Sequence, residues 1–193
     1  MNDKKPEKDK SLEQQCVCPS WFCFSFDNPV RRLLQNPETI LQPYIKPGWT
    51  ILDVGPGVGY FTIPLAKLVG DKGKVIAADL QEKMLEGIRR RAKKAGLVNR
   101  IEFNLSRPES IGITGAMDFC LAFWMVHEVP DRPRFITEIA NILKPGGLFL
   151  LAEPKVHVSK KSFDATLEIA RGAGLTLVER PKIFFSYAAL LKK

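Results

Sequence analysis

The chain of 193 residues is 45% hydrophobic and 26% charged, which is typical of a globular protein and excludes wholesale disorder. Its longest apolar runs, residues 21–26 and 119–126, are far shorter than the roughly 20 residues that cross a bilayer, and its length suits one domain with a short extension. The net charge of +8 is compatible with an anionic partner and equally with a solvated basic face, so charge alone assigns no partner.

The first 47 residues differ in character from the rest of the chain. Residues 1–15 are polar and their basic and acidic side chains balance, so we predict a disordered tail. Residues 16–47 are irregular and rich in proline, with one short helical stretch at 30–36, and are predicted to form an N-terminal cap on a domain at 48–193. The charged N-terminus lacks an apolar signal-peptide core, so we expect a cytoplasmic protein.

From Trp49 onward, short apolar runs alternate with helical stretches. Strands are predicted at residues 50–54, 74–80, 100–105, 117–123, 147–153, 175–180 and 182–190, and helices at 58–69, 81–95, 134–143 and 160–171. The alternation favours a mainly parallel sheet with helices on both faces. Only Pro181 separates the last two runs, so these strands must be antiparallel neighbours. The predicted fold class is therefore α/β: a single-domain, doubly wound, Rossmann-like sheet of seven strands with one antiparallel strand near the C-terminus.

The most informative segment is DVGPGVG (53–59), which lies between the first predicted strand and the first predicted helix. Its alternating glycines let a ligand approach the backbone, although they could also serve only a tight turn. The dinucleotide fingerprint G-x-G-x-x-G is not met, because position 60 is Tyr. Asp53 would repel a pyrophosphate and instead suits a cationic ligand such as S-adenosylmethionine. Asp79 closes the second strand, at a position where acids accept hydrogen bonds from ribose hydroxyls.

Four motifs together resemble the class I S-adenosylmethionine-dependent methyltransferases: ILDVGPGVGYFT (51–62), VIAADL (75–80), MDFCLAFWMVHEVPD (117–131) and LKPGGLFLLAEP (143–154). The resemblance covers about residues 48–190 and is greatest to the ubiquinone/menaquinone-biosynthesis-type small-molecule branch. It implies S-adenosyl-L-methionine as the cofactor. The residues that it implies at the cofactor are Asp53, Gly55, Gly57 and Gly59 at the methionine part, with Pro56 and Tyr60 in the same loop, Asp79 and Leu80 at the ribose and adenine, and Ala122 and Phe123 beside the cofactor.

One segment departs from the family pattern. After the third strand the family often has an acid that contacts the adenine amino group, and here Arg107 stands at that position. Arginine cannot accept a hydrogen bond. Backbone groups, Ser106 or Glu109 are the alternatives for reading adenine, and we keep Ser106 and Arg107 as the candidate residues on that side.

Methyl transfer from a sulfonium is an in-line displacement, in which good alignment alone can supply roughly 7–11 kcal/mol. A base is needed only if the acceptor must lose a proton. His127 is the candidate base, because its ordinary pKa of about 6.5 suits proton transfer near neutral pH. It could equally order its loop by bonding the backbone. Glu128 could orient His127 or start the next helix, and His157 is a weaker candidate that we expect at the surface.

The predicted acceptor is a small or lipophilic molecule, because Trp124, Met125 and the aromatic residues of the cap suggest an apolar pocket. Nucleic acid is disfavoured: residues 122–125 lack the Asn/Asp-Pro-Pro-aromatic segment of amino-methylating nucleic-acid enzymes, and Cys120 is expected in the core rather than as a nucleophile. The basic run at 89–94 is expected to be a solvated helix face.

Three cysteines in the cap, Cys16, Cys18 and Cys23, could bind a soft metal or metalloid, although packing is the preferred interpretation. Their spacing does not suit a zinc site, and no resident metal is predicted. The alternatives that stay open are an arsenite-type methyltransferase, an RNA methyltransferase, a nicotinamide-dependent oxidoreductase and a non-catalytic thiol-rich binding protein. The sequence does not give the oligomeric state.

Overall fold

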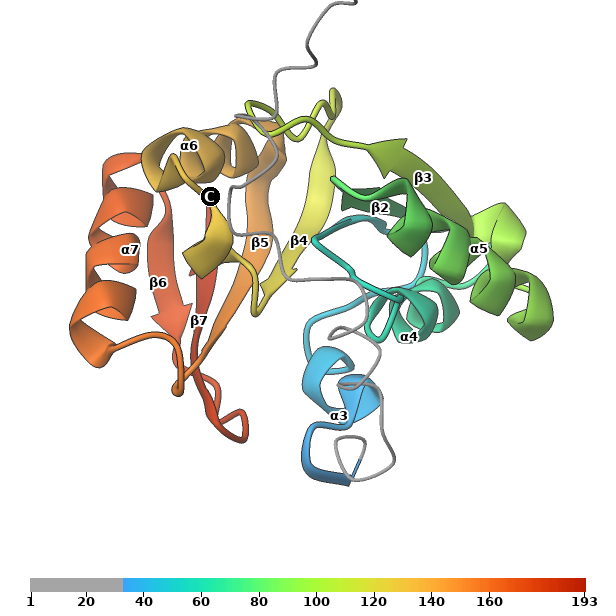
Figure 1. Ribbon diagram of the computed structural model, residues 1–193, viewed down its shortest axis with the longest axis horizontal. Coiled ribbons are helices and arrows are strands. Elements are labelled where there is room, and N and C mark those ends of the chain that lie inside the picture. The colour runs from blue at the N-terminus through green and yellow to red at the C-terminus, as the bar shows by residue number, and fades with distance from the viewer. Residues whose placement is uncertain (1–32) are drawn as a thin grey trace, which may run out of the picture.

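The computed structural model describes residues 33–193 of the chain (Figure 1). The predicted tail, the three cysteines of the cap and the first part of the predicted helix at 30–36 lie outside the described residues. Within residues 33–193, no helix is both long enough and apolar enough to pass through a bilayer.

A seven-stranded sheet with the order β3-β2-β1-β4-β5-β7-β6 forms the centre of the molecule (Figure 1). The strands are β1 (Thr50–Val54), β2 (Lys74–Asp79), β3 (Ile101–Leu105), β4 (Met117–Phe123), β5 (Leu143–Pro154), β6 (Thr176–Glu179) and β7 (Ser186–Lys192). The first five strands are parallel, whereas β7 runs antiparallel to both β5 and β6. The predicted fold class, including its single reversed strand near the C-terminus, is confirmed.

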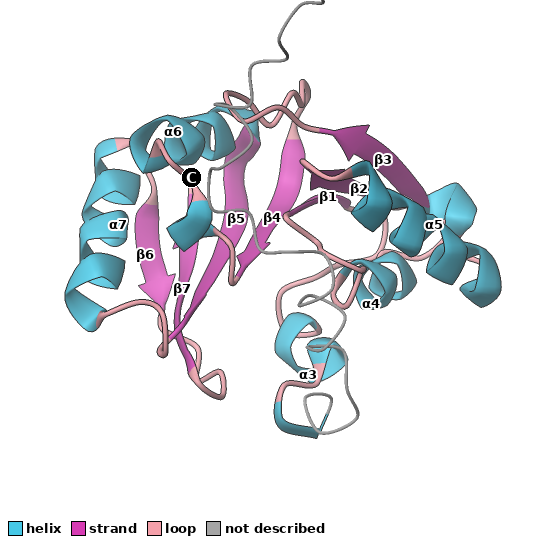
Figure 2. Cartoon of the chain, viewed as in Figure 1, coloured by secondary structure: helices cyan, strands magenta, loops and turns pink. Residues whose placement is uncertain are grey.

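Helices cover both faces of this sheet (Figure 2). They are α3 (Pro37–Leu41), α4 (Thr62–Leu68), α5 (Glu82–Ala95), α6 (Arg132–Ile142) and α7 (Lys160–Gly172), with short 3-10 turns at η2 (Val98–Arg100) and η3 (Val126–Glu128). Alternate residues along each buried strand point to opposite faces, so Ile51 packs with α4 and α5 while Leu52 packs with α6 and α7. Cys120 is fully buried on the second face, as expected of a core residue.

Local sequence signals explain where the helices begin and end. The Asp131 side chain accepts the backbone N–H of Arg134 at 3.0 Å and caps α6. Ser159 caps α7 in the same way. The amphipathic helix α5 ends at Gly96, whose φ of 70° is a left-handed conformation that glycine adopts without steric cost.

Three predicted boundaries are wrong by four residues: β5 begins at Leu143 rather than at residue 147, and backbone geometry explains the other two. The helix predicted at 58–69 begins only at Thr62, because Gly59 has a φ of 86° and the residues before Thr62 form turns. The last strand begins at Ser186 rather than at 182, because Phe185 takes a left-handed φ of 55°. The connection from β6 to β7 is therefore longer than the single proline predicted.

The described part of the predicted cap contains a helix that the sequence reasoning missed. In α3, Asn36 accepts the backbone N–H groups of Glu38 and Thr39, and Pro37 follows it at the first helical position. Leu41 and Ile45 are buried in the same core cluster as Ile51 of β1. Residues 33–47 thus share the core of the main domain.

Candidate functional site

The carboxyl ends of the parallel strands meet at one edge of the sheet, where ligands of doubly wound sheets bind. Asp53 lies near the end of β1 with only 2% of its surface exposed, and the Thr62 hydroxyl donates to its Oδ2 at 2.7 Å. Burial raises the pKa of Asp53 to about 7; the hydrogen bond from Thr62 opposes the rise and the nearby charge of Asp79 adds to it. Among residues 33–193 no basic side chain forms an ion pair with this carboxylate. A cationic ligand would balance its charge.

A second carboxylate, Asp79, ends the neighbouring strand β2. Its Oδ1 accepts the backbone N–H of Gln81 at 2.9 Å, and the backbone N–H groups of Gly57 and Leu80 also donate to its carboxylate. Burial raises its pKa to about 6 in spite of these hydrogen bonds. The N–H of Gly55 donates to the carbonyl of Ala78 at 2.9 Å, so the glycine loop after β1 is also joined to the end of β2.

The three alternating glycines of this loop all have left-handed backbone, with φ of 61° at Gly55, 54° at Gly57 and 86° at Gly59. A Cβ at Gly55 would lie 3.0 Å from the side chain of Met125, and one at Gly59 would lie 3.0 Å from Ile88. At Gly57, by contrast, no heavy atom within the described part of the chain lies within 4 Å of such a Cβ. Gly55 and Gly59 are therefore required by packing, whereas Gly57 presents open backbone to a ligand.

The other two predicted loop residues stabilise the loop. The carbonyl of Pro56 accepts the N–H of Gly59 at 3.0 Å and closes a tight turn. The Tyr60 hydroxyl donates to the carbonyl of Gln35 at 2.9 Å, and its ring meets the edge of Phe61 at 5.3 Å. Tyr60 thus ties the loop to the segment before α3.

The segment after β3 borders Asp79 on the adenine side predicted from the sequence. The N–H of Ser106 donates to the carbonyl of Asp79 at 2.9 Å, and its hydroxyl donates to the carbonyl of Ile111. Arg107 forms an isolated bridge with Ser110 and has an exposed side chain. Leu80 is 42% exposed and offers an apolar surface next to the acid.

The end of β4 is buried and aromatic. Ala122 pairs with Val54 of β1 and is fully buried. The Phe123 ring lies 4.2 Å from that of Phe61, between centroids, so the strand end and the start of α4 pack together. Both predicted residues lie next to the glycine loop through these contacts.

His127 lies in the η3 turn immediately after this strand, and its partner is Glu153 at the end of β5. The distance between His127 Nδ1 and Glu153 Oε2 is 2.6 Å. The same carboxylate accepts the backbone N–H of Val126 at 2.9 Å and of His127 at 3.1 Å. Two roles were open for Glu128, orienting His127 or starting the next helix. Its carboxylate lies 3.9 Å from Nε2, too far for a hydrogen bond, so Glu153 is the residue that orients the ring.

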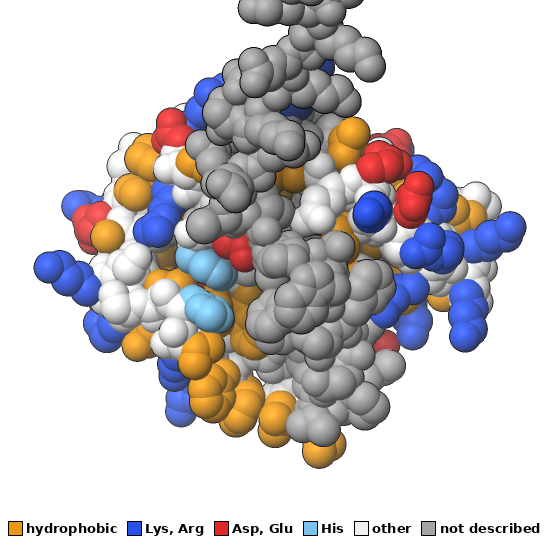
Figure 3. Space-filling model, viewed as in Figure 1, with side chains coloured by type: hydrophobic (Ala, Val, Ile, Leu, Met, Phe, Trp, Pro, Cys, Tyr) orange, Lys and Arg blue, Asp and Glu red, His pale blue; other side chains and the backbone are white. Residues whose placement is uncertain are grey.

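The hydrogen bond to Glu153 raises the pKa of His127 above its ordinary value, and burial opposes the rise. Glu153 was missed as a functional residue, although an acid at the end of a buried strand was the available signal. His157 is exposed, as expected, yet its ring stacks on that of His127 with centroids 5.9 Å apart and planes 5° from parallel. Figure 3 shows the two histidines side by side on one face of the molecule.

Trp124 connects β4 to the start of β7 and has strained backbone. Its φ of 63° is left-handed, which costs about 1–3 kcal/mol for a residue other than glycine. Its N–H donates to the carbonyl of Ala152 at 2.7 Å, and its indole N–H donates to the hydroxyl of Ser186 at 2.9 Å. These bonds hold the residue where the chain turns toward His127.

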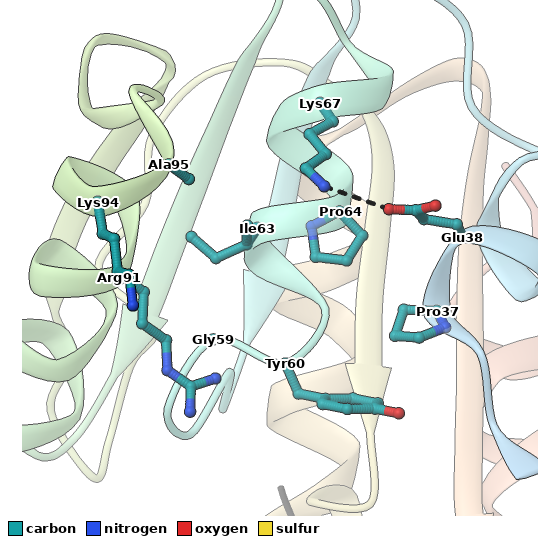
Figure 4. Close-up of a pocket in the computed structure, with 10 residues that line it drawn as sticks. All are labelled: Pro37, Glu38, Gly59, Tyr60, Ile63, Pro64, Lys67, Arg91, Lys94 and Ala95. Carbon is teal, nitrogen blue, oxygen red and sulfur yellow. Dashed lines mark hydrogen bonds and ion pairs between the residues drawn. The ribbon is translucent and has the colours of Figure 1, made fainter. Parts of the chain in front are cut away.

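A separate cleft of about 370 Å³ lies on the outer side of the glycine loop (Figure 4). It is bordered by Gly59, Ile63, Lys67 and Arg91, and Lys67 reaches Glu38 of α3 at 3.4 Å. Neither aspartate and neither histidine borders it, so the candidate site is placed by the carboxylates and His127 rather than by this hollow. Within residues 33–193 no cluster of three or more metal-ligating side chains is present.

The chain is similar to known proteins at the level of family, sequence and structure. Residues 51–147 match the methyltransferase domain family. The ubiquinone/menaquinone biosynthesis C-methyltransferase of Escherichia coli is 29% identical over 125 residues, which are 63% of this chain; the chain spans about half the length of that relative.

Among solved structures, an S-adenosylmethionine-dependent methyltransferase from Aquifex aeolicus has a TM-score of 0.81 and 26% identity, covering 91% of this chain and 99% of its own. The N-methyltransferase NodS from Bradyrhizobium japonicum, in complex with S-adenosyl-L-homocysteine, has a TM-score of 0.69 and 17% identity, covering 86% of this chain and 89% of its own, which indicates a shared fold.

Proposed function

Because the chain belongs to the methyltransferase domain family and has the fold of S-adenosylmethionine-dependent methyltransferases, we propose that it methylates a small or lipophilic acceptor with His127 as general base. The observation that carries the proposal is the bond between His127 and the buried Glu153, on the sheet edge that also holds Asp53 and Asp79. One edge then combines anionic groups for a cationic cofactor with a base for the acceptor.

The chemistry of the edge suits S-adenosylmethionine. Asp53 and Asp79 are buried carboxyls with raised pKa values, so an ammonium group and ribose hydroxyls would favour their ionised forms. Gly57 leaves room for a close approach to the backbone, and Leu80 offers an exposed apolar surface on which adenine can pack. When bound, the cofactor supplies a methyl group that is already activated by the sulfonium.

The arrangement of His127 supports its role as a base. Glu153 accepts a hydrogen bond from Nδ1 of His127, so in the neutral ring the proton lies on Nδ1. Nε2 is then the nitrogen that takes a proton from the methyl acceptor. The raised pKa makes the neutral imidazole a stronger base. Below that pKa the ring is protonated and cannot accept a proton from the methyl acceptor. Activity should therefore rise with pH through the pKa of His127.

The apolar lining expected of the acceptor pocket is supported by Phe123, Trp124 and Met125, all partly or fully buried beside the glycine loop. The alternative of thiol-based arsenite methylation depends on Cys16, Cys18 and Cys23, which lie outside the described residues. No observation within residues 33–193 favours that alternative over a carbon, oxygen or nitrogen acceptor.

The test combines binding with turnover. We expect S-adenosylhomocysteine to bind the wild-type protein in calorimetry, and we expect transfer of labelled methyl to a member of a panel of phenols, enols and amines. His127→Ala should lower kcat by about 10²–10⁴-fold without changing affinity for S-adenosylhomocysteine, because a general base contributes that much to rate.

Glu128→Gln is the matched control, and it should change kcat less than about threefold because the carboxylate is too distant from the ring for a hydrogen bond. An unchanged kcat in His127→Ala would remove the base from the proposal. A protein that binds no S-adenosylhomocysteine would remove the proposal altogether.

A further inference from the structure

Five exposed apolar side chains gather next to the candidate site, from three separate parts of the chain. They form what we term the apolar rim: Leu33 (85% exposed), Leu34 (46%), Val156 (71%), Phe184 (48%) and Phe185 (54%). Exposed apolar residues scattered singly need no explanation, but a contiguous group on one face marks an interaction surface. Figure 3 shows hydrophobic side chains gathered along the lower edge of the face that carries the two histidines.

One side-chain and one backbone hydrogen bond join the three parts of the apolar rim. The side-chain amide of Gln35 donates to the carbonyl of Phe184 at 2.7 Å, and the N–H of Lys155 donates to the carbonyl of Phe185 at 3.0 Å. The rings of Phe184 and Phe185 lie 5.1 Å apart. The rim is therefore a defined surface rather than a set of unrelated loop residues.

The fold holds Phe185 in the rim at a conformational cost. Its φ of 55° is a conformation that glycine or asparagine adopts more easily than a bulky aromatic residue. The chain thus places a large ring, more than half exposed, at a position where both its backbone and its exposure are unfavourable in water. Such a residue is stabilised if a partner removes the ring from water.

The apolar rim adjoins the acceptor side of the site. Ser186, directly after Phe185, accepts the indole N–H of Trp124, and it pairs across the sheet with Pro154. Glu153, the partner of His127, precedes Pro154 in β5. Phe185 of the rim is therefore connected to the proposed base, His127, through Ser186, the pairing of β7 with β5, and Glu153.

Cations border the apolar rim. Lys155 and Lys182 are exposed and lie within two residues of rim residues in the sequence; the Lys155 ammonium lies 5.3 Å from the centroid of the Tyr187 ring, and Arg180 is held by Asp164 at 3.1 Å. The nearby acid Glu179 already accepts a hydrogen bond from Tyr44. An apolar surface with a basic border is complementary to an anionic bilayer, into which rings insert while lysines meet phosphate headgroups. A second copy of the chain is a poorer match, because a two-fold contact would bring like charges together.

We propose that the apolar rim, with Lys155 and Lys182, docks the protein on the surface of an anionic lipid bilayer. The acceptor side of the site then faces the lipid, so that a lipophilic acceptor enters from the membrane without crossing water; this last step rests on the proposed function, whereas the docking does not. A peripheral contact of this kind agrees with the predicted cytoplasmic location.

The experiment is co-sedimentation of the full chain with vesicles of phosphatidylcholine, with and without phosphatidylglycerol. We expect binding to the anionic vesicles that weakens with added salt. Phe184→Ser combined with Phe185→Asn should lower the partition coefficient about tenfold or more, because two rings no longer insert, and asparagine keeps the left-handed backbone. Lys155→Glu combined with Lys182→Glu should lower binding to the anionic vesicles at least as much.

Matched controls alter the same chemistry elsewhere. Val98→Ser removes an exposed apolar side chain in η2, and Lys93→Glu combined with Lys94→Glu reverses two charges on α5. Both controls should retain most of the vesicle binding, and circular dichroism and affinity for S-adenosylhomocysteine verify that every variant is folded.

Two results would overturn the docking proposal: a wild-type protein that does not bind anionic vesicles, or control variants that lose as much binding as the rim variants. A rim variant that changes the oligomeric state, with no vesicle binding in the wild type, would assign the surface to a second copy. Vesicle binding is measured without cofactor or turnover, so its failure and the failure of the proposed methyl transfer are distinguishable.

Discussion

Replacing Asp53 by asparagine should stabilise the protein in the absence of ligand. Burial raises the pKa of Asp53 from 3.8 to about 7, so between these values the unfolded chain releases a proton that the folded chain retains. Folding is therefore penalised increasingly as the pH rises through this window, and the penalty is complete above pH 7. The difference of roughly three pKa units corresponds to a penalty of up to about 4 kcal/mol.

The asparagine variant lacks this penalty and retains the hydrogen bond from Thr62, because its amide oxygen can still accept. Chemical denaturation should show Asp53→Asn to be more stable than the wild type at pH 8, by up to about 4 kcal/mol, and nearly equal to it at pH 4. The pH dependence is the diagnostic part, because a simple packing effect would be the same at both values.

The same change should weaken the binding of S-adenosylhomocysteine, whose ammonium group we expect at Asp53. A lost charge-assisted hydrogen bond corresponds to a decrease in affinity of about tenfold to a hundredfold. In the wild type, Asp53 is mostly protonated at pH 6 and mostly ionised at pH 8, so binding should be about tenfold weaker at pH 6. Calorimetry in two buffers should detect the proton that binding releases.

The reasoning would be refuted if Asp53→Asn were equal to or less stable than the wild type at pH 8 while its fold remained intact. Unchanged ligand affinity in the same variant would instead separate the buried carboxyl from the cofactor and leave the stability argument in place.

Two further predictions concern the proposed base and the glycine loop. Glu153→Gln should lower kcat about tenfold to a hundredfold and move the inflection of the pH–rate profile to lower pH, because the hydrogen bond to Glu153 is the main reason why the pKa of His127 is raised. An inflection at the same pH as in the wild type would exclude a positioning role for Glu153. Gly57→Ala should lower the free energy of unfolding by only about 1 kcal/mol but weaken S-adenosylhomocysteine binding more than about tenfold in calorimetry. Gly55→Ala, whose Cβ would meet Met125, should lower the melting temperature more than Gly57→Ala does. A larger loss of melting temperature in Gly57→Ala than in Gly55→Ala would contradict the assigned roles.

The strands could be predicted closely wherever they are buried on both faces. Continuous apolar runs predict residues 50–54 and 117–123 with the bounds that the structure has, because such runs are typical of the interior strands of a parallel sheet. The start of α4 and the start of β7 could not be predicted as well. Both depend on a left-handed residue, at Gly59 and Phe185, and for Phe185 no feature of the residue type signals that conformation.

The candidate site was predictable where a loop motif or a strand end marks its residues. The spacing of Asp53 and the glycines, and the position of Asp79 at a strand end, are enough to identify the loop edge from the amino-acid sequence alone. The pairing of His127 with Glu153 was harder to predict, because the carboxylate reaches the ring only through the pairing of β4 with β5, and a strand-end acid alone does not say which residue it contacts. Glu128 was the nearer acid in sequence, yet its direction from η3 sets it too far from the ring.

Glu153 holds the turn at residues 126–127 by two main-chain amides as well as by the imidazole. The shape of that turn is thus largely independent of which side chain occupies position 127. Evolution or an engineer could exchange the histidine for another reactive group without rebuilding the scaffold, so this corner of the fold is suited to acquiring new chemistry.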